Sequence, residues 1–146
     1  MLSPMKLETE QDIIRELQQR AANIAEAMKR RWKEHKGIST HCFMWPGTIV
    51  KADDGQLLDC PVIAAIPESE RDEFLKAMTK KTDAYAIVLI EKKAQALSVH
   101  FECHQGTRVW TTPLHWQGDV QRMGETEVED NTKSLNLLWS PNRGSA

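Results

Sequence analysis

The sequence predicts an α+β fold with two helices packed on one face of a mostly antiparallel sheet of about five to six strands. Three patterns support this class: an amphipathic period near the start, an apolar run from Ala84 to Ile90, and an alternation from Leu97 to Cys103. The expected order is helix, two strands, helix and three strands. We expect residues 1–139 to form one domain and residues 140–146 a flexible tail.

The first element is a long helix from about Glu8 to Lys36. Acidic residues near its start and basic residues near its end suit the helix macrodipole. Its apolar residues recur at the spacing of one helix face: Ile13, Ile14, Leu17, Ala21, Ile24, Ala25, Met28 and Trp32. Five of these positions also approach a heptad pattern. The sequence therefore leaves two partners open for this face, the protein's own sheet and a second copy of the chain.

A hairpin is predicted next, from strands at residues 39–45 and 57–66. The sequence Asp53-Asp54-Gly55 between them is a strong turn signal. Pro61 in the second strand indicates a sheet edge or a bulge.

A short helix and a central strand follow. Proline and acidic residues at 67–73 suit a helix start, and the helix has a narrow apolar face formed by Phe74, Leu75 and Met78. Residues 84–90 are apolar throughout, as expected of a strand covered on both faces. This strand is the predicted centre of the core.

Two strands then form a second predicted hairpin, residues 96–104 and 107–112, with Gln105-Gly106 as the turn and Pro113 as the end. Alternation in the first strand places the odd-numbered residues 97–103 in the interior and the even-numbered residues 98–104 toward solvent or a ligand. Residues 117–133 are expected to form a mobile loop or a weak edge strand. Residues 134–139 are expected to form a last strand or a helical turn.

The candidate catalytic residues are His100, Glu102 and His104, which share the outer face of their predicted strand. Two imidazoles and a carboxylate suit a zinc or iron centre, or a histidine base oriented by Glu102. However, positions i and i+4 on a flat strand are about 13 Å apart, so one ion requires a bent strand or other ligands. A polar solvated face is the simpler interpretation, and we assign no metal site from the sequence.

The chain has three cysteines, Cys42, Cys60 and Cys103, and none forms a CxxC pair. This number and spacing favour a reducing compartment, and we expect a cytoplasmic protein. Cys103 is in phase with the inward-facing residues, so a catalytic role with a neighbouring histidine is disfavoured.

Two further residue sets are candidates for binding. Tryptophan combines apolar area with one hydrogen-bond donor, which is useful in pocket walls and interfaces; the candidate ligand-binding residues are Arg108, Trp110, His115 and Trp116. A basic cluster around an aromatic residue can contact phosphates and stack a base; this set is Lys29, Arg30, Arg31, Trp32 and Lys33. A basic helix end is also an ordinary feature of surface helices.

Charge, hydrophobicity and motifs argue against several functional classes of protein. Lys and Arg number 19, and Asp and Glu number 21, so no global charge favours nucleic acid. The longest apolar run is far shorter than the about 20 residues that cross a bilayer, and the first residues resemble no secretory signal. No phosphate-loop, dinucleotide, hydrolase-elbow or HExxH pattern is present, and no cofactor is expected.

The prediction is therefore a non-enzymatic binding or accessory domain. We expect it to dimerise through its first helix or a sheet edge and to present a tryptophan-containing surface to a protein or small molecule. The alternatives are a small metal-dependent or acid–base hydrolase that uses the His/Glu/His face, and nucleic-acid binding through the basic helix end.

Overall fold

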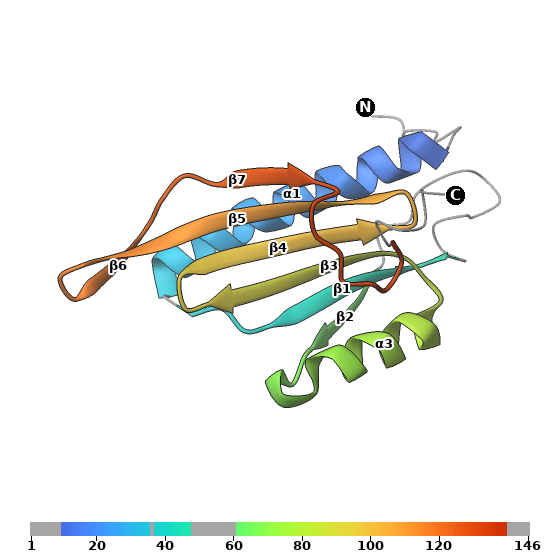
Figure 1. Ribbon diagram of the computed structural model, residues 1–146, viewed down its shortest axis with the longest axis horizontal. Coiled ribbons are helices and arrows are strands. Elements are labelled where there is room, and N and C mark those ends of the chain that lie inside the picture. Colours follow the sequence, from blue (N-terminus) through green and yellow to red (C-terminus); the bar gives the residue numbers. More distant parts are fainter. Residues whose placement is uncertain (1–9, 36, 48–60, 140–146) are drawn as a thin grey trace, which may run out of the picture.

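A computed structural model describes residues 10–35, 37–47 and 61–139 of the chain. These residues form two α-helices and seven strands in one sheet (Figure 1). The helices are α1 (Glu10–His35) and α3 (Arg71–Thr82), with a short 3-10 helix η1 (Glu68–Glu70) before α3. The strands are β1 (His41–Pro46), β2 (Val62–Ala65), β3 (Ala84–Lys93), β4 (Ala96–Cys103), β5 (Gly106–Gln117), β6 (Val120–Met123) and β7 (Glu127–Asp130). The predicted α+β class and element order are confirmed.

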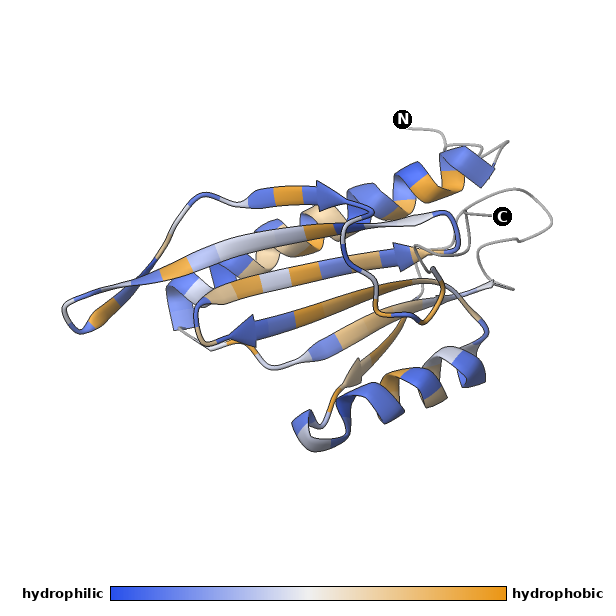
Figure 2. Ribbon diagram, in the orientation of Figure 1, coloured by the Kyte–Doolittle hydropathy of each residue, from blue (hydrophilic) through white to orange (hydrophobic). Residues whose placement is uncertain are grey.

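The strands lie in the order β2-β1-β3-β4-β5-β6, and β7 also pairs with β5. Every pairing is antiparallel. The central strand β3 is buried from Ala84 to Ile90, as its apolar sequence predicts, and Figure 2 shows it hydrophobic over most of its length. Residues 48–60, which include Cys60 and the predicted turn at 53–55, lie outside the described residues, as does the predicted tail at 140–146.

The two helices cover opposite faces of the sheet, so the prediction that both lie on one face is wrong. Leu17 of α1 belongs to the same core cluster as Val88, whereas Leu75 of α3 belongs to a second cluster with Leu89. Successive side chains on a strand point to opposite faces, so Val88 and Leu89 need separate covers. An apolar strand such as β3 therefore requires a helix on each side.

The apolar face of α1 packs on the protein's own sheet. The buried residues of this helix are Ile14, Leu17, Ala21, Ala25, Met28 and Trp32. At the helix start, the Tyr85 hydroxyl donates to the Glu10 carboxylate at 2.9 Å. The sequence left two partners open for this helix face, the protein's own sheet and a second copy of the chain. In the structure the helix face packs on the sheet.

Strand β5 continues past Pro113, so the prediction that this proline ends the strand is wrong. Residues 108–111 pair with β7, and residues 114–117 pair with β6. Pro113 lies between these two partners and opposite Ala96, the first residue of β4, so the ladders tolerate its missing N–H. The carbonyl oxygen of Pro113 accepts the N–H of Gly124 at 2.8 Å. Residues 117–133 were expected to form either a mobile loop or a weak edge strand. The structure shows two short strands at the sheet edge, β6 and β7.

Candidate functional site

The odd-numbered face of β4 is buried as predicted, but the even-numbered face is not open to solvent. Phe101 and Cys103 lie in the α1 core. Glu102 has 0% of its surface exposed and His100 has 8%, so the predicted solvated face is wrong at these two positions. Residues 134–139, which we call the covering segment, cross this face in an irregular conformation rather than as the predicted strand or helical turn (Figure 1).

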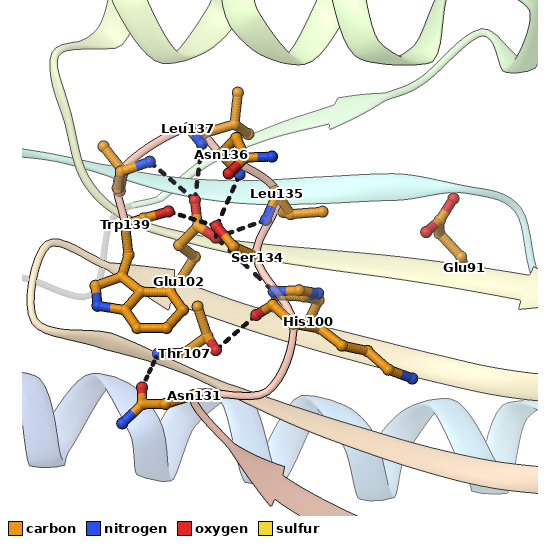
Figure 3. Close-up of polar contacts among 12 residues, drawn as sticks. Glu91, His100, Glu102, Thr107, Asn131, Ser134, Leu135, Asn136, Leu137 and Trp139 are labelled. Carbon is orange, nitrogen blue, oxygen red and sulfur yellow. Dashed lines mark hydrogen bonds and ion pairs between the residues drawn. The ribbon is translucent and has the colours of Figure 1, made fainter. Parts of the chain in front are cut away.

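The covering segment is irregular because its backbone donors bind a side chain instead of a neighbouring strand. The Oε1 atom of Glu102 accepts the N–H of Leu135 at 2.8 Å and the hydroxyl of Ser134 at 3.1 Å. Its Oε2 atom accepts the N–H groups of Leu137 at 3.0 Å and Leu138 at 2.8 Å (Figure 3). Three backbone N–H groups thus satisfy a buried carboxylate, which would otherwise be costly to remove from water. The Ser134 hydroxyl assists them, although its single proton is shared with the Trp139 carbonyl.

The residues just before the covering segment are anchored to β5. The N–H of Thr107 donates to the Asn131 side chain at 2.8 Å, and the N–H of Asn131 donates back to the Thr107 carbonyl at 2.9 Å. The Thr107 hydroxyl also donates to the Lys133 carbonyl at 2.7 Å. A Cβ atom at Gly106 would collide with the Asn131 side chain, so this approach requires glycine.

His100 lies beside this cluster without joining its hydrogen bonds. Its Nε2 atom is 3.9 Å from Oε1 of Glu102 and is buried with no hydrogen-bond partner among the described residues. Burial lowers the pKa of His100 below its ordinary value of 6.5, and this effect outweighs the opposing attraction of Glu102. The imidazole is therefore neutral at pH 7.

His104 does not meet the other two candidate residues. It follows the last residue of β4 and is exposed. Within residues 10–35, 37–47 and 61–139, no three His, Cys, Asp or Glu side chains are close enough to hold a metal ion. Glu91 stands apart from Glu102 in Figure 3 and binds Arg71 through both oxygens, at 2.7 and 2.9 Å.

The two described cysteines are buried. Cys103 lies on the α1 side of the sheet and Cys42 on the α3 side. Burial raises the pKa of both thiols, which disfavours the thiolate needed for nucleophilic attack. This agrees with the inward orientation expected for Cys103.

The tryptophan set divides between the core and the surface. Trp110 is buried against α1, while 66% of Trp116 is exposed. Arg108 pairs with Asp130 of β7 at 2.6 and 3.0 Å, and His115 is exposed. These four residues therefore do not form one pocket.

Trp116 lies on a two-stranded ribbon, formed by residues 114–123, that extends beyond the other strands (Figure 1). Gln117 pairs with Val120, so the ribbon turns through two residues, and the first of them, Gly118, has a φ of 62°. Such a turn favours glycine. The sequence does contain a signal for this turn, the dipeptide Gly118-Asp119, which is typical of a two-residue hairpin turn. It was missed because the whole stretch 117–133 is polar and acidic.

A groove of about 470 Å³ lies between this ribbon and the end of α1. Its lining residues are Lys29, Trp32, Lys33, Val120, Gln121, Arg122, Met123 and Gly124. The structure thus brings part of the basic cluster beside the ribbon. Arg30 and Arg31 are exposed but do not line the groove. Sequence reasoning missed Arg122, whose place in the groove depends on the ribbon.

No protein-family model, curated protein or solved structure matches this chain. In the described part of the chain, no helix is long and apolar enough to cross a membrane.

Proposed function

We propose that the protein is a non-enzymatic binding domain that contacts a partner protein through the ribbon at residues 114–123. The observation that carries this proposal is the 66% exposed Trp116 on a projecting two-stranded element. Val120, opposite Gln117 on the same ribbon, is 47% exposed. Exposed tryptophan is enriched among the residues that dominate binding energy at interfaces.

The surroundings of Trp116 support a partner that is a protein. Trp116 and Gln121 pair directly, so they lie on the same ribbon face, and Gln121 lines the groove beside α1. A projecting ribbon next to an open groove presents a broad contact surface, whereas small-molecule sites are concave and enclose most of the ligand.

The polar face of β4 supports a structural role better than a hydrolytic one. A general base or a metal ligand needs free lone pairs that face a substrate. Both oxygens of Glu102 instead accept hydrogen bonds from the covering segment. His104 is exposed beyond the end of β4, so it does not complete a site with His100 and Glu102.

We also propose that the protein forms a homodimer. The apolar face of α1 is buried against the sheet, so the dimer contact is placed at a sheet edge. Strand β2 is one edge, and 62% of its Ile63 is exposed. Strand β7 carries Glu127, Glu129 and Asp130, so pairing with its own copy would oppose like charges. We also propose a cytoplasmic location, which the two buried free thiols support.

A site-specific cross-link tests the ribbon. A photoreactive benzoylphenylalanine at position 116 should capture a partner in cells, while the same group at Val128, which is 54% exposed on β7, should not. The captured protein is then purified, and its affinity for the Trp116→Ser and Val128→Ser variants is measured by calorimetry. We expect Trp116→Ser to weaken binding at least about tenfold and Val128→Ser less than about twofold. Equal affinities, or no capture at position 116, would contradict the proposal.

A further inference from the structure

We propose that the groove between the ribbon and the end of α1 binds an acidic, amphipathic peptide segment of the partner protein. This inference rests on the proposed binding role of the ribbon and adds the chemistry of the partner. Lys29 and Lys33 of α1 give the groove its positive charge, and no acidic residue among those described lines it; Arg122 borders the groove from the ribbon face opposite Gln121. These cations come from two elements, the last turns of α1 and strand β6.

The three cations have capacity for an external carboxylate. Lys33 and Arg122 are exposed and form no ion pair with the described residues. Lys29 contacts Glu26 at 3.3 Å, but the Glu26 side chain is 69% exposed. An ion pair of this exposure contributes little stability, so Lys29 can exchange Glu26 for a carboxylate of the partner.

The remaining lining favours an apolar side chain beside the acidic ones. Trp32 is only 2% exposed and Met123 packs against the core beneath α1, so the two residues give the groove an apolar base. Val120 adds exposed apolar area at the rim. Methionine adapts its shape to different apolar groups. The volume of about 470 Å³ holds a few side chains of a peptide.

The charge of the whole protein and of strand β7 disfavours a long nucleic acid as the ligand. Phosphate chains bind to extended rows of cations, and this binding weakens steeply with salt. Here the protein has a net charge of −2, and the neighbouring edge strand β7 carries Glu127, Glu129 and Asp130. A short acidic peptide can contact the groove without crossing β7.

The experiment selects peptides from a random dodecapeptide phage library on the immobilised full-length protein. We expect the recovered peptides to be enriched in Asp and Glu next to leucine, phenylalanine or tryptophan. A synthetic peptide from the selection is then titrated by fluorescence anisotropy, together with the same peptide carrying Gln and Asn in place of Glu and Asp. The acidic peptide should bind at least about tenfold more tightly than its amide form.

Two double variants with the same loss of charge locate the binding site. Lys29→Gln with Lys33→Gln should weaken the acidic peptide at least about tenfold, because both lysines line the groove. Arg30→Gln with Arg31→Gln should change its affinity less than about threefold, because these arginines do not line it. Circular dichroism is used to check that both variants keep their helix content.

Several results would overturn the inference. They are an absence of recovered peptides, recovered peptides without an excess of acidic residues, equal effects of the two double variants, and tighter binding of a labelled 20-nucleotide oligothymidine than of the peptide. Peptides that need Trp116 but carry no acidic excess would overturn only the charge preference. The binding role of the ribbon would then stand.

Discussion

The backbone N–H of Leu138 donates to the Oε2 atom of Glu102 at 2.8 Å, across 36 residues of sequence. With the N–H of Leu137 on the same oxygen, it holds the covering segment over β4. Because Glu102 has no exposed surface, its charge is stabilised by these donors rather than by water.

Replacing Glu102 by glutamine should therefore destabilise the fold. The amide would turn an NH₂ group toward backbone N–H donors and leave at least one of them unsatisfied. We expect a loss of about 3 kcal/mol in the free energy of unfolding, measured by urea denaturation. The matched control is Glu127→Gln on the exposed strand β7, with an expected change below about 0.5 kcal/mol. A Glu102→Gln loss as small as the control's would show that the covering segment does not depend on this charge.

His100 should make stability depend on pH. Burial lowers its pKa in the folded protein below the ordinary value of 6.5, so the unfolded chain takes up a proton before the folded one does. Its contribution is fully present above about pH 6.5 and decreases as the pH falls below that value, by at most about 1.4 kcal/mol per pH unit. The His100→Leu variant should lose less stability than the wild type between pH 7.5 and 5.5.

Urea denaturation at both pH values measures this difference. His104→Gln is the control, because the His104 side chain is exposed in the folded protein. A pH slope in His100→Leu that matches the wild type would refute a buried neutral imidazole.

The thiols of Cys42 and Cys103 should react slowly in the native protein. Their pKa values are raised by burial, and their side chains have 0% and 2% exposure. In a Cys60→Ser background, we expect the reaction with Ellman's reagent at pH 8 to be at least about a hundredfold slower than in guanidinium chloride. Rapid labelling of one thiol in the native protein would mean that its face of the sheet opens.

The homodimer prediction leads to a test at the β2 edge. If two copies meet there, Ile63→Asp should place a charge in the interface and convert the dimer into a monomer in sedimentation velocity. Val128→Asp on the β7 edge should leave the dimer unchanged. A wild-type protein that is monomeric at micromolar concentration would contradict self-association itself.

Regular periodicity made much of this fold predictable from the sequence. The apolar stripe ending at Trp32 correctly predicted α1, and the continuous apolar run at 84–90 correctly predicted the central strand β3. The alternation from Leu97 to Cys103 gave the buried α1 face of β4. In each case burial repeats at the period of the element, so local residue order carries the information.

The polar half of β4 was not predictable in this way, because its cover comes from distant residues. No pattern in the sequence around Glu102 predicts its hydrogen bonds with the N–H groups of residues 135, 137 and 138. The groove depends likewise on a tertiary meeting, between Lys29 of α1 and Arg122 of β6. Charge and hydropathy locate these residues on their elements, but only the packing of the elements brings them together.

The pairing of Glu102 with the covering segment also sets an order of events during synthesis. Strand β4 leaves the ribosome before residues 134–138, so its carboxylate remains hydrated while the rest of the sheet is already available to pair. A chain halted at Lys133 would lack the three backbone N–H donors and the Ser134 hydroxyl that contact that carboxylate. The part of this face around Glu102, which the covering segment protects, therefore stays open to water until residues 134–138 have been translated, although α3 already covers Leu89 beside it.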